Sequence, residues 1–90
     1  MADKVFIALQ NNEESRPIIE AIVEDNPEAI ANYTPGMVKI DCNNRLVIKR
    51  ESIEEKIGRD FDLQEIHINL ISLSGNIDED EDELVLQRLG

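Results

Sequence analysis

The stretch MVKIDCNNRLVIKR, residues 37–50, has the clearest alternation of apolar and polar side chains in the chain. Val38 and Ile40 alternate with polar residues before the Asn43-Asn44 pair, and after it Leu46 and Ile48 share one face while Arg45 and Lys49 fall on the other. A period of two is typical of half-buried strands. Asparagine tolerates the positive φ that a two-residue turn needs. The stretch therefore predicts a β-hairpin.

Towards the N-terminus, the sequence predicts a strand, a helix and a second strand. The apolar run at 5–9 is strand-like, and Ser15-Arg16-Pro17 is typical of a helix start, with Ser15 as the capping residue. Asn26-Pro27 ends this helix, because the residue before a proline is pushed out of the helical region. Residues 29–33 then form a strand that leads into a turn at 34–36.

Towards the C-terminus, two capping boxes predict helical turns. Ser52 precedes Glu55 by three residues and opens a helix that Gly58 ends. Asp62 and Glu65 repeat the pattern and predict one further turn.

A strand is expected from residue 66, where apolar and polar residues alternate until the period slips at Leu70-Ile71. Such a slip predicts a bulge or a strand buried on both faces. Ser74-Gly75-Asn76 ends the strand, the acidic residues 78–83 form a solvated loop, and 84–86 form the last strand. The predicted fold is α+β, one small domain over residues 1–90, with mixed or antiparallel strands in the order β-α-β-β-β-α-β-β and a three-strand meander in the middle.

The charge balance excludes several partners. Twenty acidic and nine basic residues give a net charge of −11, which argues against binding to nucleic-acid phosphates and to anionic membranes. Six of the bases fall between residues 39 and 59. They form either part of a surface of balanced charge or a docking patch for a partner. The single cysteine permits no internal disulfide, and the N-terminal residues have no signal-peptide pattern, so we expect a cytoplasmic protein.

Few residues have the chemistry of a catalytic or metal site. His67 has no second histidine or correctly spaced glutamate beside it, and Cys42 has the position of a buried apolar residue. The acidic run fails the EF-hand pattern, because Glu83 and Leu89 stand where glycine and glutamate are needed. We therefore expect no cofactor, no metal and no catalytic residue, and a protein that acts by binding.

Several stretches resemble one family. They are VFIALQNNE at 5–13, Arg16-Pro17, EAI at 20–22, EDNP at 24–27, VKID at 38–41 and KIGRDFDLQEIHINL at 56–70. Together they resemble the small regulatory (effector or coupling) proteins of bacterial multicomponent di-iron monooxygenases, and among these the phenol hydroxylase regulatory component.

The resemblance implies a cofactor-free protein that binds the di-iron hydroxylase near its active-site pocket and modulates turnover and coupling. It also implies a functional link to a flavin/iron–sulfur reductase. In the methane-oxidising relatives, the segment that faces the hydroxylase carries an Ile-Asn-x-x-Ser-x-x-Gly pattern. This pattern is matched here by Ile68, Asn69, Ser72 and Gly75. Bulkier residues stand at 71 and 73 than in those relatives. The candidate partner-binding residues are Asn69, Ile71, Ser72, Leu73, Gly75 and Asn76.

Other classes of function stay open at this point. The main alternative is a free-standing regulatory domain that binds a small molecule. An acidic mimic of nucleic acid would need charges spaced like phosphates, whereas these concentrate in one run. An enzyme is disfavoured by the lack of nucleophiles and bases. For Ile71 and Leu73, ordinary core packing is the competing interpretation.

Overall fold

Residues 4–88 are the part of the chain that the computed structural model describes, and they form strands and short helices. In chain order the elements are β1 (Lys4–Gln10), α1 (Arg16–Asp25), β2 (Ile30–Tyr33), β3 (Met37–Asn43), β4 (Arg45–Lys49), α2 (Arg50–Ile57), the 3₁₀ helix η1 (Leu63–Glu65), α3 (Ile66–Asn69), β5 (Leu70–Ser74), β6 (Asn76–Glu79) and β7 (Glu83–Gln87). The predicted α+β class and the predicted order of elements are confirmed. The short helix α3 and the strand β6 are additional.

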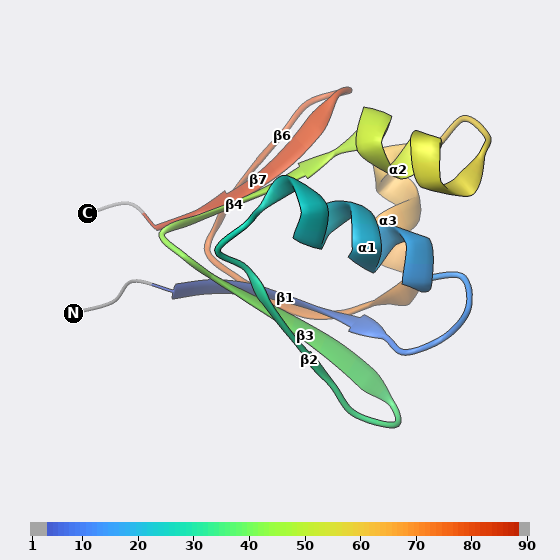
Figure 1. The fold of residues 1–90 in the computed structure, drawn as a ribbon. Helices are drawn as coiled ribbons and strands as arrows, with labels where there is room; N and C mark the ends of the chain where they lie inside the picture. Colours follow the sequence, from blue (N-terminus) through green and yellow to red (C-terminus); the bar gives the residue numbers. More distant parts are fainter. Residues whose placement is uncertain (1–3, 89–90) are drawn as a thin grey trace.

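The strands form two antiparallel sheets, one with the order β2-β3-β1-β5 and one with the order β4-β7-β6. Figure 1 shows that the sheets diverge from the side where β1 begins and β7 ends, and that α1 lies in the wedge between them. Fully buried side chains from both sheets meet there, among them Ile7, Ile40, Leu46 and Leu86, and α1 adds Ile22. One aliphatic core thus holds both sheets together.

The predicted hairpin of residues 37–50 is wrong in its pairing. Asn44 does have the expected positive φ, 64°, and both halves are strands. However, β3 pairs with β1 and β2, so neither of its edges is free for β4. β4 pairs instead with β7 in the second sheet. The turn at Asn44 therefore carries the chain from one sheet to the other, and the predicted meander is not formed.

The N-terminal end of α1 is fixed by Asn12 and not, as predicted, by a Ser15 cap. The Ser15 side chain makes no capping hydrogen bond. Its backbone N–H donates to Asn12 Oδ1 at 2.8 Å. The Asn12 side chain therefore closes the loop before the helix, and Ser15 is completely buried. Pro17 lies in the first turn, as expected.

The C-terminal end of α1 is tied to the free edge of β4 by Asn26. Its Nδ2 donates to the carbonyl oxygens of Ile22 and Val47, both at 2.7 Å, and its Oδ1 accepts the Val47 N–H at 2.9 Å. The amide thus pairs with Val47 as a neighbouring strand would, which closes part of an otherwise open sheet edge. The predicted helix end at Asn26 is confirmed.

Helix α2 begins at Arg50, two residues before the predicted start, so the prediction that Ser52 caps the helix is wrong. The helix follows β4 without a loop, and the Arg50 N–H donates to the Asp82 carbonyl at 2.9 Å. Gly58 ends the helix in the left-handed conformation (φ 74°), as predicted. None of the helices within residues 4–88 is long and apolar enough to cross a membrane.

Candidate partner-binding surface

All the candidate binding residues lie on one continuous piece of chain that forms an edge of both sheets. We call residues 68–77 the edge segment; it comprises the end of α3, β5, Gly75 and the start of β6. β5 is the outer strand of the larger sheet and β6 of the smaller one. Each leaves one row of backbone N–H and C=O groups without a strand partner, which is the feature that makes sheet edges prone to association.

The edge segment begins with a helical turn and not with the predicted strand. Asp62 Oδ1 accepts the Gln64 N–H at 2.9 Å, and Glu65 Oε2 accepts the Asp62 N–H at 2.9 Å, so the predicted capping box is confirmed. This turn continues directly into α3, which overrides the alternation of residues 66–70. Ile66 consequently points into the core, whereas Ile68 is 64% exposed.

The predicted bulge at Leu70-Ile71 is confirmed. Leu70 pairs with Leu9 and Ser72 pairs with Ala8, so Ile71 is an extra residue in β5. A bulge bends the edge strand and changes the direction of its side chains. Ile71 is 48% exposed, and Ser72 next to it is also exposed.

The second half of β5 faces the core. Leu73 pairs with Ile7 and packs as a half-buried side chain against the core cluster. Gly75 then turns the chain into β6 with a φ of 128°, and a Cβ at this position would meet Val5 Cγ1 at 2.8 Å. Asn76 is exposed, and Ile77 after it is 51% exposed.

Asn69 differs from the other candidates because its side chain is engaged inside the protein. It is only 6% exposed, and its Oδ1 accepts Asn12 Nδ2–H at 2.9 Å. The structure therefore brings Ile71, Ser72 and Asn76 to the surface, while Asn69 and Leu73 face inwards. Two further exposed residues, Ile68 and Ile77, are not among the predicted binding residues. Both become predictable when residues 66–69 are taken as a helical turn and the residues after Gly75 as a strand.

Some of the acidic residues beside the edge segment belong to a strand or stabilise a turn. Glu79 belongs to β6, so the predicted loop is shorter than 78–83. Asp80 Oδ1 accepts the N–H groups of Glu83 at 2.9 Å and Asp82 at 2.8 Å, and these hydrogen bonds lower the pKa of Asp80. The carboxylate at 80 therefore closes the β6–β7 turn.

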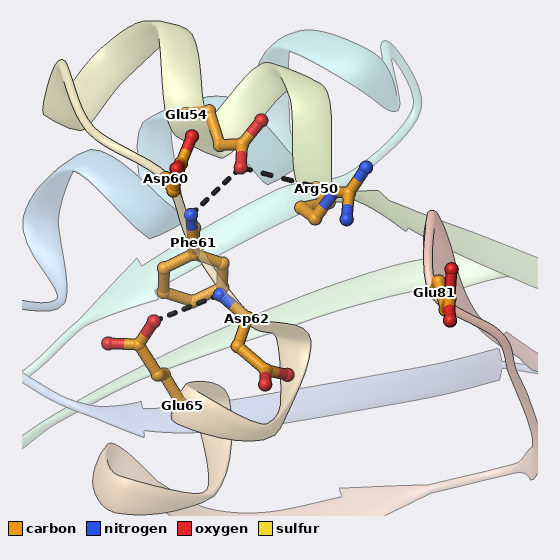
Figure 2. A pocket seen from close by; sticks show the side chains of 7 residues that line it. All are labelled: Arg50, Glu54, Asp60, Phe61, Asp62, Glu65 and Glu81. Atoms are coloured by element: carbon orange, nitrogen blue, oxygen red, sulfur yellow. Dashed lines mark hydrogen bonds and ion pairs between the residues drawn. The ribbon is translucent and has the colours of Figure 1, made fainter.

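An open hollow of about 690 Å³ lies between α2, η1 and this turn (Figure 2). Its lining residues are Arg50, Glu54, Asp60, Phe61, Asp62, Glu65 and Glu81. Two of the carboxylates hold the backbone of the loop after α2: Glu54 Oε2 accepts the Phe61 N–H at 2.8 Å, and Glu65 accepts from Asp62. The Asp62 N–H and Arg59 together lower the pKa of Glu65. These groups stabilise the loop that precedes the edge segment.

The bases of residues 39–59 do not form one patch. Four are ion-paired: Lys39 with Asp41 at 3.6 Å, Arg50 with Asp82 at 3.1 Å, Arg59 with Glu65 at 3.3 Å, and Lys56 with Glu24. Lys39 lies on the larger sheet, Arg45 and Lys49 lie on the smaller one, and the other three bases lie on α2 or in the loop after it. The interpretation as a balanced surface therefore fits better than a docking patch.

The lone histidine and cysteine are not part of the edge segment. His67 is exposed on α3. Cys42 is 6% exposed on β3, and burial raises the pKa of its thiol. Within residues 4–88, no group of three or more histidine, cysteine, aspartate or glutamate side chains could hold a metal ion.

Comparison with known proteins gives a consistent result over nearly the full chain. Residues 3–87 match the model of the MmoB/DmpM family. The chain is 44% identical over 87 residues, 97% of each sequence, to the stimulatory component DmpM of phenol 2-monooxygenase from Pseudomonas sp. (strain CF600).

Two solved structures extend the comparison. A chain from a structure of a phenol hydroxylase–regulatory protein complex superposes with a TM-score of 0.91 at 50% identity, covering 94% of this chain and 98% of that one. The regulatory protein B of soluble methane monooxygenase shares the fold, with a TM-score of 0.77 at 20% identity, covering 99% of this chain and 67% of that one.

Proposed function

The chain belongs to the MmoB/DmpM family, and we propose from this premise that it is the regulatory component of a multicomponent phenol (aromatic) monooxygenase. In this role it is not itself an enzyme: it binds the di-iron hydroxylase component and modulates its turnover and coupling. The observation that carries the proposal is the 44% identity, over 97% of each sequence, to a stimulatory component of a phenol monooxygenase. The oxygen chemistry then belongs to the hydroxylase, and electrons reach it from a flavin/iron–sulfur reductase in the cytoplasm.

The edge segment is the proposed hydroxylase-binding surface. Its proposed contact residues are Ile71, Ser72, Gly75 and Asn76, and the inward-facing Asn69 and Leu73 support it from inside. Isoleucine is among the residues most often buried, yet three isoleucines of this one segment, Ile68, Ile71 and Ile77, are each about half exposed or more. Ser72 and Asn76 supply polar groups beside them. Apolar anchors within a polar surround are the usual arrangement of a binding hot spot.

Regulation follows if the edge segment binds one conformation of the hydroxylase more tightly than another. A binding protein shifts a conformational equilibrium only by its difference in affinity for the two states. A preference of about 2 kcal/mol changes their ratio about thirtyfold. Contacts at three isoleucines and two polar side chains are sufficient for a difference of this size.

The direct test is reconstitution with purified hydroxylase and reductase. We expect product formation to rise when the protein is added, and the protein alone to have no oxygenase activity and no iron in elemental analysis. The protein heated past unfolding is the matched control. An unchanged rate on addition of the folded protein, or stoichiometric iron in the isolated protein, contradicts the proposal.

Association with the hydroxylase is expected to slow as salt rises. A net charge of −11 steers the protein towards a basic surface, and this steering is screened when the Debye length falls from about 10 Å at 0.1 M salt to about 3 Å at 1 M. Stopped-flow association rates across this range measure the effect. Dissociation rates should change much less, because apolar contacts dominate the bound state. Association rates that are flat with salt would exclude electrostatic steering.

A further inference from the structure

Asn12 lies outside the edge segment, but its side chain joins the β1–α1 loop to the edge segment by a hydrogen bond. Its Nδ2 donates to Asn69 Oδ1 at 2.9 Å, across a separation of 57 residues in sequence. Its Oδ1 accepts the Ser15 N–H at 2.8 Å. Both ends of one amide are therefore used, one for the start of α1 and one for the end of α3.

The Asn12 backbone is fixed as well. Its N–H donates to the Gln10 carbonyl at 3.2 Å, and its carbonyl accepts the Arg16 N–H at 3.2 Å. Asn12 is thus held between the end of β1 and the first turn of α1. A side chain on such a rigid base can fix the position of whatever it binds.

The segment that Asn12 binds has few other restraints. β5 pairs with β1 alone, and the register shift at Ile71 interrupts that pairing. Edge strands with few backbone partners open most easily. Asn69 is the last residue of α3 and lies between the exposed Ile68 and Ile71. The partly buried hydrogen bond from Asn12 therefore holds the chain at a point between the two isoleucines.

We propose that Asn12 is a positioning residue of the regulatory protein: through its hydrogen bond to Asn69 it holds the α3–β5 junction so that Ile68 and Ile71 stand ready for the hydroxylase. This inference rests on the proposed function of the edge segment. It assigns Asn69 an internal role, as the acceptor through which Asn12 acts. Pre-ordering a binding segment raises affinity because less conformational freedom is lost on association.

The test uses the different hydrogen-bonding capacities of the two side chains: an amide both donates and accepts, whereas an ionised carboxylate only accepts. Asn12→Asp still accepts the Ser15 N–H, and the Asn69 amide can rotate to donate to it. Asn69→Asp still accepts from Asn12. The double variant Asn12→Asp/Asn69→Asp places two acceptors together with no donor between them, so only the double variant breaks the pair. The matched control, Gln10→Glu/Asn43→Asp, adds the same two charges at exposed positions.

The readouts are the activation curve of the hydroxylase at pH 8, the melting temperature and amide hydrogen exchange in β5. We expect both single variants and the control to behave as the native protein. The double variant should exchange its β5 amides faster and need about tenfold more protein for half-maximal activation, at an unchanged maximal rate, as expected for the loss of one ordering hydrogen bond. Should the double variant not fold, Asn12→Ser replaces it, because a serine hydroxyl accepts from Ser15 but is too short to reach Asn69.

Three results would overturn the inference. One is an activation loss in the double variant that only follows its unfolded fraction. Another is unchanged exchange in β5. The third is unchanged activation in the double variant while Ile71→Asp weakens activation, which rules out the role of Asn12 and leaves the edge segment as the binding surface. If Ile71→Asp is also without effect, the edge segment itself is not the hydroxylase-binding surface.

Discussion

Ile71→Asp is expected to raise the concentration of regulatory protein needed for half-maximal hydroxylase activation by about thirtyfold or more, since losing a hot-spot side chain costs about 2 kcal/mol or more. The melting temperature should stay nearly unchanged, because Ile71 is 48% exposed and is the extra residue of a bulge. An activation titration beside a thermal melt measures both quantities.

Two control variants make this result specific. Leu73→Ala, two residues further on, removes a half-buried side chain that packs against the core, so it should lower the free energy of unfolding by about 1–3 kcal/mol, less than a fully buried leucine. Ile30→Asp changes an isoleucine that is 61% exposed on β2, the opposite edge of the larger sheet. Ile30→Asp should leave activation unchanged. A loss of activation with Ile30→Asp but not with Ile71→Asp would place the binding surface on the β2 edge.

Local backbone requirements explain which parts of the fold are predictable from the sequence. Proline at 17, the Asn26-Pro27 pair, the positive φ of Asn44 and the left-handed Gly58 each constrain their own neighbours. The bulge at Ile71 is visible as a slip in the apolar period, because side-chain direction in a strand follows sequence position. Such signals need no knowledge of what packs nearby.

Pairing between distant segments explains which parts of the fold are not predictable from the sequence. The alternation in residues 37–50 indicates strands but not their partners, and β3 finds both of its neighbours elsewhere in the chain. Residues 66–69 alternate like a strand, yet the capping box of Asp62 and Glu65 starts a helical turn that includes them. In the same way, the six candidate binding residues could be placed on one segment from the sequence. The inward direction of Asn69 could not, since it depends on Asn12, 57 residues away.

Gly75→Ala is expected to produce the largest loss of stability among substitutions of the three glycines within residues 4–88. Gly75 has a φ of 128°, and an added Cβ would lie 2.8 Å from Val5 Cγ1. The backbone strain costs about 1–3 kcal/mol, and the steric overlap with a buried valine costs about 1–3 kcal/mol more. Because small domains have total stabilities of about 5–15 kcal/mol, the melting temperature should fall by about 10 °C or more.

Two other glycines separate these contributions. Gly58 has a φ of 74° with no atom within 4 Å of an added Cβ, so Gly58→Ala introduces backbone strain alone, about 1–2 kcal/mol. Gly36 has neither constraint, so Gly36→Ala should be neutral or slightly stabilising. Chemical denaturation of the three variants gives the ranking. Equal losses for Gly58→Ala and Gly75→Ala would mean that the contact with Val5 is unimportant.

The contact with Val5 can be measured directly in a Val5→Ala background. That variant removes Cγ1, the atom that an alanine at 75 would approach most closely. Gly75→Ala should then cost about 1–3 kcal/mol less than in the native background, because only backbone strain is left, and the difference is the coupling energy between the two positions. Since Gly75 joins β5 to β6, relief of this overlap should also restore hydroxylase activation where the protein is folded. An unchanged cost in the Val5→Ala background would assign the whole effect of Gly75→Ala to its positive φ.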